Sequence, residues 1–249
     1  MFENIKNTFI VRLSGGLGNQ FFQYAYGRSL VNKKTSVKID ISYYNKQKKR
    51  TYGLDNFRTT IKIAGLIEVF IHKYLFPNTY ITGEFQDEKY FLDISNIIRD
   101  EFAIKEKLRA DLENIASKIQ TNDSVSVHIR RTDYLSKKHR FVILDTKYYK
   151  KAIKLMTEKV KDPKFFFFSD DIEWVKENIQ HPDDSIFLSN KDFEDMHLMS
   201  LCKHNITANS TFSWWAAWLN KNQNKIVITP QRWFSDNTSI AIPETWQKI

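Results

Sequence analysis

Short apolar runs alternate with amphipathic segments through the second half of the chain. Strands of this kind, each followed by a helix, are typical of a parallel sheet that helices cover on both faces. The expected strands are 125–129, 165–168, 185–188, 204–208 and 225–229, and the expected helices between them are 147–160, 172–179, 192–202 and 214–219. We therefore predict a Rossmann-type, nucleotide-binding domain in this half.

The first half of the chain is less regular but begins in the same way, with a strand, a glycine-rich turn and a helix. The expected strands are 8–13, 36–41 and 80–85, and the expected helices are 19–32, 87–99 and 105–120. A Thr-Asn-Asp sequence at 121–123 breaks the last helix before the regular half begins. We therefore predict an α/β protein of two lobes, residues 1–122 and 123–249, that face a cleft.

Residues 61–76 form the most apolar long window of the sequence, IKIAGLIEVFIHKYLF. The ionisable residues Lys62, Glu68, His72 and Lys73 interrupt it, and it is too short to span a bilayer comfortably. The pattern indicates an amphipathic helix. We expect this helix to pack between layers of the fold, with contact to a membrane surface as the alternative.

Composition and charge narrow the class of protein without choosing a function. Hydrophobic residues make up 42% of the 249 residues and aromatic residues 14%, which excludes a disordered chain. The formal net charge of +9 suits a polyanion, an anionic membrane surface or a phosphorylated substrate. Cys202 is the single cysteine, and the first residues lack the pattern of a signal peptide, so we expect a cytoplasmic protein.

Two arginines directly follow the expected strand at 125–129. In an open parallel sheet the ligand crevice lies beyond the carboxyl ends of the strands. The residues placed there are His128, Arg130, Arg131 and Asp133. Asp133 can pair with one guanidinium, and a pyrophosphate suits the other because its oxygens match the fork of N–H donors. The alternative is a structural ion pair at the strand end.

A glycine cluster, SGGLGNQFFQ at 14–23, follows the first strand. Gly16 and Gly18 suggest a dinucleotide fingerprint, but Phe21 stands where a third glycine or alanine belongs. The sequence does not continue as a P-loop either. The glycines therefore predict a tight turn against a ligand, with Asn19 at the helix start, or a purely structural turn.

Polar residues also stand at the ends of two further strands. Asn209, Ser210 and Thr211 precede a tryptophan-rich helix, which Ser210 or Thr211 can cap while its free N–H groups form an anion site. Asp170 follows the phenylalanine run together with Ser169 and Asp171. A carboxylate there can accept hydrogen bonds from a guanine edge or a ribose, and helix capping by Ser169 or Asp170 explains it equally well.

The sequence resembles the bacterial α-1,2-fucosyltransferases of glycosyltransferase family 11 over nearly its whole length. The shared motifs are SGGLGNQFFQYAYGRSL, FQDEKYF, VSVHIRRTDYL, FSDDIEWVK and DMHLMSLCKHNITANSTFSWWAAWLN. This resemblance implies a fold of the GT-B type, in which two Rossmann-like lobes face a cleft. It also implies that residues 123–249 hold most of the GDP-fucose, with residues 1–122 as the acceptor-side lobe.

The resemblance maps the family's His-x-Arg-Arg-x-Asp motif onto His128, Arg130, Arg131 and Asp133, and the chemistry of the residues suggests their roles. We expect Arg130 to stabilise negative charge on the departing GDP, and Asp133 is the candidate base. The residues expected to contact the donor are Gly18, Asn19, His128, Arg131, Asp170, Asn209, Ser210, Thr211 and Phe212. We expect no metal and no cofactor, because the sequence has no pair of aspartates separated by one residue and no clustered histidine spacing.

The predicted reaction is an inverting, metal-independent transfer of L-fucose from GDP-β-L-fucose to the 2-hydroxyl of a galactose residue in an acceptor glycan. The same donor motifs would suit another glycan hydroxyl or a protein serine or threonine. A non-enzymatic basic protein that binds a polyanion is the alternative from another class. The family suggests work on lipopolysaccharide O-antigen and peripheral contact with the inner membrane face, and we expect no nucleic-acid partner.

Overall fold

The computed structural model describes residues 7–33, 35–47 and 49–249. The first six residues, which begin the stretch without a signal-peptide pattern, lie outside this part, as do Lys34 and Lys48. Among the helices built from the described residues, none combines the length and the apolar character that crossing a bilayer requires.

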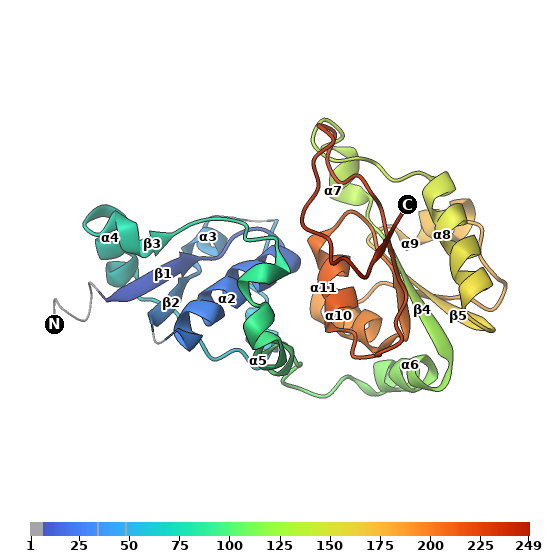
Figure 1. Ribbon diagram of the computed structural model, residues 1–249, viewed down its shortest axis with the longest axis horizontal. Helices are drawn as coiled ribbons and strands as arrows, with labels where there is room; N and C mark the ends of the chain where they lie inside the picture. The colour runs from blue at the N-terminus through green and yellow to red at the C-terminus, as the bar shows by residue number, and fades with distance from the viewer. Residues whose placement is uncertain (1–6, 34, 48) are drawn as a thin grey trace. The chain divides into compact units, whose positions relative to one another are not determined.

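The chain divides into two compact units, Met1–Glu106 and Lys107–Ile249, coloured blue to green and green to red in Figure 1. The sequence predicts the boundary between residues 122 and 123 instead. The difference arises from helix α6, Ala110–Thr121, which packs on the sheet and on another helix of the second unit. An amphipathic helix belongs to the unit that covers its apolar side, and breaking residues after it do not change that.

The first unit contains a three-stranded parallel sheet in the order β2-β1-β3. Its strands are β1 Thr8–Arg12, β2 Ser36–Asp40 and β3 Tyr80–Ile81. The strand expected over 80–85 therefore ends after two residues. Phe85 has a φ of 51°, and its ring stacks on Tyr26 with centroids 3.9 Å apart, so the backbone has already left the extended conformation there.

Helix α2 packs on this sheet and contributes the buried aromatic side chains Phe21, Phe22 and Tyr24. The helices of the first unit are α2 Leu17–Asn32, α3 Ser42–Asn45, α4 Leu66–Tyr74 and α5 Ser95–Glu101, with short 3-10 turns η1 Leu54–Asn56, η2 Pro77–Thr79, η3 Glu88–Tyr90 and η4 Leu92–Ile94. Phe21 of α2 is fully buried and stacks on Phe102 with ring centroids 3.8 Å apart. Residues 87–99, which were expected to form one helix, instead form the turns η3 and η4 and the first part of α5.

The second unit contains a six-stranded parallel sheet in the order β6-β5-β4-β7-β8-β9. Its strands are β4 Asp123–Ile129, β5 Pro163–Ser169, β6 Ile186–Leu188, β7 His204–Ile206, β8 Val227–Thr229 and β9 Gln247–Lys248. The five strands expected from the apolar runs are confirmed, and β9 was not expected. Successive strands are added outward from β4 on one side and from β7 on the other, so the order reverses between these two neighbours.

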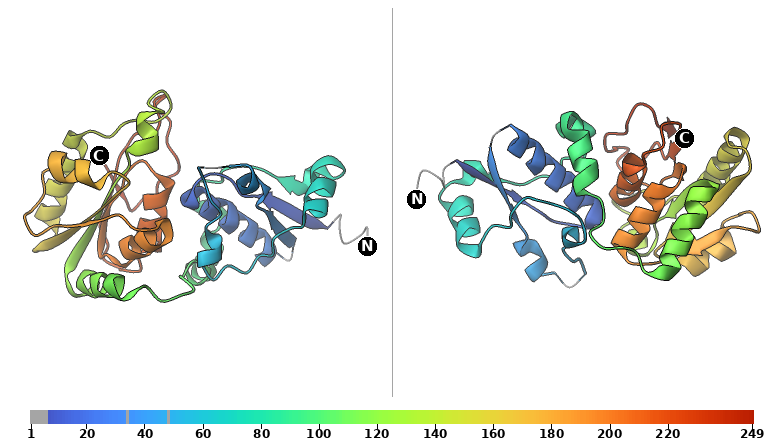
Figure 2. Two further views of the ribbon diagram at one scale, coloured as in Figure 1. Left: turned by 180° about the vertical axis from the view of Figure 1, so that it is seen from behind. Right: turned by 90° about the horizontal axis from the view of Figure 1, so that it is seen from below.

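Helices cover both faces of the second sheet, as the buried strands predict. Besides α6, they are α7 Thr132–Leu135, α8 Thr146–Lys159, α9 Ile172–Asn178, α10 Asp192–Leu201 and α11 Thr211–Leu219. Val125, Val127 and Ile129 of β4 pack in one cluster with α8 and α9. Helices α10 and α11 lie on the other side of the sheet in both views of Figure 2, and buried Asn205 there donates a hydrogen bond to Ser126 Oγ at 2.7 Å.

Candidate functional site

The reversal of strand order between β4 and β7 marks the place where an open parallel sheet usually binds its ligand. The loop that follows β4 starts at Arg130, and the loop that follows β5 starts at Asp170. Ile129 and Ser169 are paired in the register of these two parallel strands, so the next residues along both chains emerge side by side. The segment that follows β7 leads into α11 from the same edge of the sheet.

Arg130 is held by carboxylates from both loops. Its Nη2 lies 2.7 Å from Asp133 Oδ1, and its Nη1 lies 3.0 Å from Asp170 Oδ2. The side chain keeps 23% of its surface exposed. A guanidinium has five N–H donors, so these two ion pairs fix its direction and leave donors for a further anion. Arg130 can therefore form the predicted ion pairs at the strand end and still bind an anion.

Arg131 points to a different set of partners. Its Nε lies 3.2 Å from Asp171 Oδ2, and its guanidinium carbon lies 3.4 Å from the centre of the Trp174 ring. Stacking on an aromatic face is a preferred arrangement for arginine, because the planar cation meets the negative side of the ring quadrupole. Trp174 comes from the first turn of α9, three residues after Asp171, so both partners of Arg131 lie on one side of that helix.

Asp170 ties the loop after β4 to the end of β5. Its carboxylate accepts hydrogen bonds from the backbone N–H of Arg131 at 2.9 Å and from Thr132 Oγ1 at 2.6 Å, besides pairing with Arg130. Burial opposes ionisation, but the charge of Arg130 and these hydrogen bonds outweigh it and lower the pKa of Asp170. Neither Ser169 nor Asp170 caps α9, whose N-cap is Asp171, so both capping predictions are wrong.

His128 is the last residue but one of β4, two positions before Arg130, and is only 4% exposed. Its ring packs against Phe212 of α11, with centroids 5.3 Å apart. Burial and, to a smaller extent, the neighbouring Arg130 charge lower the pKa of His128 to about 3, although the charge of Asp170 opposes the change. The imidazole is therefore neutral near pH 7. It packs between the strand end and the start of α11 and adds no positive charge.

The start of α11 confirms one prediction about the Asn-Ser-Thr triplet. Ser210 is the N-cap, and its Oγ accepts a hydrogen bond from the backbone N–H of Phe212 at 3.4 Å. Thr211 is the first residue of the helix. Asn209 is 2% exposed, and its Nδ2 donates to the carbonyls of Val142 and Trp233 at 2.8 and 2.9 Å. These amide donors hold two loops in place, so the Asn209 side chain has a structural task.

Seven of the predicted residues are thus gathered by direct contacts or chain neighbourhood at the carboxyl edge of one sheet. They are His128, Arg130, Arg131, Asp133, Asp170, Ser210 and Phe212, with Asn209 and Thr211 adjoining Ser210. Sequence reasoning missed Thr132, Trp174 and Tyr134. Tyr134 donates from its hydroxyl to the carbonyl of Asn209 at 3.0 Å and so links the loop after β4 to α11. Trp174 was detectable from its helical spacing after Asp171.

Gly18 and Asn19 belong to the first unit, at the start of α2. Gly16 is the N-cap of this helix, which begins at Leu17, two residues before the expected start at Asn19. Asn19 lies in the first turn, where its Oδ1 accepts a hydrogen bond from Gln86 Nε2 at 3.3 Å. The turn itself needs Gly15, which has a φ of +79°, and a Cβ atom there would lie 2.8 Å from Asn19 Nδ2.

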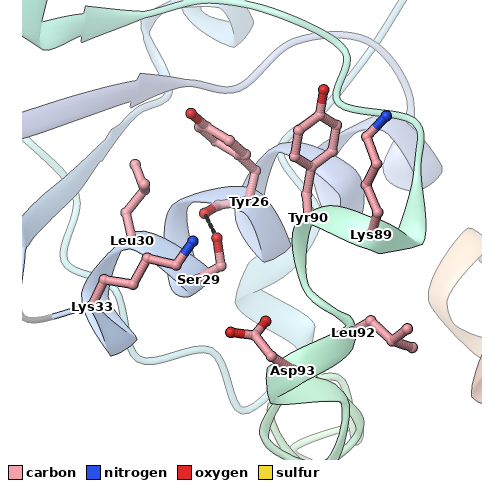
Figure 3. Close-up of a pocket in the computed structure, with 8 residues that line it drawn as sticks. All are labelled: Tyr26, Ser29, Leu30, Lys33, Lys89, Tyr90, Leu92 and Asp93. Atoms are coloured by element: carbon pink, nitrogen blue, oxygen red, sulfur yellow. Dashed lines mark hydrogen bonds between the residues drawn. The ribbon is translucent and has the colours of Figure 1, made fainter.

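A separate hollow of about 570 Å³ opens in the first unit (Figure 3). It is lined by Tyr26, Ser29, Leu30, Lys33, Lys89, Tyr90, Leu92 and Asp93. These residues come from the second half of α2, from its C-cap Lys33 and from the η3 and η4 turns, whereas Gly18 and Asn19 lie in the first turn of α2. No predicted site residue lines it. In the described part of the chain, no group of three or more His, Cys, Asp or Glu side chains is placed to hold a metal ion.

Sequence comparison points to one family along most of the chain. The family model described as Glycosyl transferase family 11 matches residues 28–247. The chain is 33% identical over 285 residues to the Alpha-1,2-colitosyltransferase of Escherichia coli, covering 96% of this chain and 98% of the relative. It is 32% identical to the O-antigen biosynthesis glycosyltransferase WbnK of Escherichia coli, with 94% and 98% covered. Galactoside alpha-(1,2)-fucosyltransferase 1 of Rattus norvegicus is 30% identical over 52% of this chain and 39% of that protein.

Solved structures share the fold at low sequence identity. The NodZ alpha-1,6-fucosyltransferase soaked with GDP-fucose superposes with a TM-score of 0.53 at 12% identity, covering 86% of this chain and 92% of that one. The ADP-heptose lps heptosyltransferase II of E. coli gives a TM-score of 0.51 at 10% identity, covering 97% and 90%. These likenesses show the fold: an α/β architecture of the GT-B type, as the sequence predicts.

Proposed function

The chain belongs to glycosyl transferase family 11, and on that premise we propose that it transfers L-fucose from GDP-β-L-fucose to the 2-hydroxyl of a galactose residue in a glycan. The family makes the protein a glycosyltransferase, which uses a sugar nucleotide and a glycan acceptor. Two observations support the finer assignment. The bacterial colitosyltransferase and the animal relatives carry α-1,2 linkages in their names, and the animal relatives are named as galactoside fucosyltransferases.

The observation that carries this proposal is the placement of Arg130. A guanidinium at the carboxyl end of the central strand, oriented by Asp133 and Asp170 and partly open to solvent, suits the diphosphate of a nucleotide sugar. The capped N-terminus of α11 stands at the same edge of the sheet, and helix N-termini favour phosphate oxygens. We assign Ser210, Thr211 and Phe212 to the donor side of the site on this ground.

In the proposed reaction, the bond between carbon 1 of fucose and the β-phosphate oxygen breaks while the galactose 2-hydroxyl attacks carbon 1 from the opposite face. The hydroxyl proton passes to solvent water late in the step, and GDP leaves with the bonding electron pair. Negative charge grows on the β-phosphate as the sugar passes through an oxocarbenium-like state. Arg130 acts by stabilising that growing charge, which makes its interaction stronger in the transition state than with the bound donor.

In this proposal Asp133 does not act as the base. Its carboxylate pairs with Arg130 at 2.7 Å and lies 3.9 Å from Lys137 Nζ. A carboxylate between two cations is well placed to orient them and poorly placed to take the proton of a neutral hydroxyl. We therefore assign Asp133, together with Asp170, to positioning Arg130. The proposal needs no metal, because arginine supplies the positive charge opposite the diphosphate.

A second donor is favoured by one comparison. The bacterial relative with 33% identity is named for transfer of colitose, which differs from L-fucose by the absence of the 3-hydroxyl group. A site built to hydrogen-bond that hydroxyl rejects the deoxy sugar strongly, whereas a site with an apolar surface there accepts both. The choice between GDP-fucose and GDP-colitose therefore depends on whether the protein offers a hydrogen-bond partner or an apolar surface at the 3-position of the sugar.

The test offers both donors separately to the purified protein with a panel of β-galactosides in excess EDTA. GDP release is measured, and the linkage of each product is determined by NMR. We expect release of GDP from GDP-fucose and an α-1,2-linked product, undiminished by EDTA. A kcat/KM that favours GDP-colitose moves the assignment to the second donor. Linkage to another hydroxyl, or no GDP release with either donor, contradicts the proposal.

A further inference from the structure

The outer surface of α4 carries an exposed apolar patch, which we call the α4 patch. In the described part of the chain, six of the nine exposed large apolar side chains lie between residues 63 and 75. They are Ile63, Leu66, Ile67, Phe70, Tyr74 and Leu75. Leu66 and Ile67 are 73% and 77% exposed, values usual for lysine and unusual for a cluster of large aliphatic residues.

Only the inner side of α4 packs against the first unit. Val69 is buried and packs with Ile10 and Ala64, while Leu66, Phe70 and Tyr74 follow each other at intervals of four on the outer side. The rings of Phe70 and Tyr74 lie 4.9 Å apart and extend the apolar surface along the helix. Figure 1 shows α4 beside β3 at the amino end of β1. The expectation that this helix packs between layers is therefore wrong for its outer side.

The charges around the α4 patch are positive. Lys62 and Lys73 are exposed at its edges. Glu68 is the single acidic residue between 57 and 79, and it pairs with Lys38 and accepts the backbone N–H of Gly65, contacts that lower its pKa. The one negative charge of the segment is thus already neutralised, whereas the two lysines at the edges stand beside apolar side chains.

We propose that the α4 patch docks on the surface of an anionic phospholipid bilayer. The helix would lie in the plane of the membrane, with Ile67 and Phe70 at the boundary between headgroups and acyl chains and with Lys73 at the phosphates. A second copy of the chain is a poorer occupant. In a two-fold interface the same patch faces itself, which brings Lys62 and Lys73 of one copy close to those of the other.

The first test uses a fluorophore that reports local polarity. Cys202 is fully buried, so a cysteine introduced by Ile67→Cys can be labelled selectively with NBD. Leu92→Cys is the matched control, because Leu92 is also exposed on the first unit but lies outside the α4 patch. We expect the emission at position 67, and not at position 92, to shift to the blue with vesicles of phosphatidylcholine and phosphatidylglycerol. Phosphatidylcholine alone, or high salt, should weaken the shift.

The second test separates the apolar and the electrostatic contributions in vesicle sedimentation. We expect Ile67→Ser and Phe70→Ser each to lower the partition constant about tenfold, and Leu92→Ser to leave it unchanged. Lys62→Gln and Lys73→Gln should each lower it about fivefold on anionic vesicles only. Circular dichroism melts of every variant show that it remains folded.

Three results would overturn the inference. The first is the absence of a blue shift at position 67, and the second is an equal loss of binding in Leu92→Ser. The third is a dimer in light scattering that Ile67→Ser and Phe70→Ser convert to a monomer while vesicles bind none of the proteins. The inference does not depend on the sugar that is transferred. If the protein binds vesicles but is inactive with both donors, the proposed function is contradicted and the membrane inference is not.

Discussion

Arg130 Nη1 lies 3.0 Å from Asp170 Oδ2, so the end of β4 and the end of β5 are joined by an ion pair. The contact follows from strand register, because Ile129 and Ser169 are partners in the sheet and the next residue on each strand leaves at the same edge. A side chain fixed in this way does not need to reorganise when charge develops opposite it, which is the property that an electrostatic catalyst requires.

Asp170→Asn should impair catalysis more than donor binding. The amide keeps the shape of the side chain but removes the charge that orients Arg130, and it cannot accept from both Arg131 and Thr132 as the carboxylate does. We expect kcat to fall about tenfold to a hundredfold, with a smaller change in KM for the donor. Steady-state kinetics on soluble galactosides measure this.

Asp184→Asn is the matched control for that variant. Asp184 pairs with Lys164 at the surface of the same unit, and its side chain is 65% exposed. Removing such a pair changes stability and activity little. Equal kinetic losses in Asp170→Asn and Asp184→Asn would contradict a specific role for Asp170 in orienting Arg130.

Gly15→Ala should destabilise the first unit by about 1 to 2 kcal/mol. The residue has a φ of +79°, in the left-handed region, and the added Cβ would meet Asn19 Nδ2 at 2.8 Å. Gly16→Ala provides the comparison, because Gly16 has an ordinary φ of −79° and its nearest neighbour, Arg50 Nη1, lies 3.4 Å from the new Cβ. Urea unfolding should show the larger loss for Gly15→Ala, and similar losses would refute the backbone explanation.

Asn209→Asp tests whether the Asn209 side chain stabilises the fold or binds the donor. The change removes both Nδ2 donors and turns a carboxylate toward the carbonyls of Val142 and Trp233. We expect the free energy of unfolding to fall by about 3 kcal/mol, and by less in Asn209→Ala. Unchanged stability with a raised KM for GDP-fucose would instead assign the side chain to donor binding.

The stability of the second unit should depend on Asp195 between pH 4 and pH 6. Burial raises the pKa of Asp195 to about 6, although hydrogen bonds from Asn190 oppose the change. A raised carboxyl pKa favours the folded state while the group is protonated, so its contribution is complete below the unfolded value of about 3.9 and is lost as pH rises through 6. The loss is at most about 3 kcal/mol.

The comparison with Asp195→Asn isolates this contribution from those of other carboxyl groups. The difference in unfolding free energy between the native protein and the variant should shrink or change sign from pH 4 to pH 6.5. Asp183→Asn, at an exposed position of the same unit, should follow the native protein at every pH. A pH-independent difference for Asp195→Asn would contradict the raised pKa.

The sheet of the second unit and the central part of the site were predictable from sequence for one physical reason. Apolar strands in a parallel sheet end at a common edge, so polar residues after Ile129 and Ser169 had to lie near each other. The capping of α11 by Ser210 follows equally from local chemistry. The contacts of Asp170 were not predictable in this way. Only the strand pairing of the structure shows that its carboxylate binds both the Arg130 guanidinium and the backbone of the loop after β4.

Other features depended on tertiary packing, which periodicity does not specify. The pattern at 61–76 predicts an amphipathic helix but does not say what covers its apolar side, and Leu66 proves to be exposed. The helix at 110–121 belongs to the second unit because its buried Leu112 and Ile119 lie there. The two hydrogen bonds that Asn209 Nδ2 donates could not be predicted either, because a structural amide and a ligand-binding amide give the same sequence pattern.

The role of Arg130 in stabilising the leaving GDP is tested most directly by single-turnover transfer with saturating donor. Arg130→Ala should lower the rate of sugar transfer about a hundredfold to a thousandfold, and Arg130→Lys should restore little of it, because an ammonium group lacks the fork of donors. Arg109→Lys, which alters a partly exposed arginine paired with Glu194, should leave the rate unchanged. A folded Arg130→Ala variant that transfers sugar at the native rate would contradict the account.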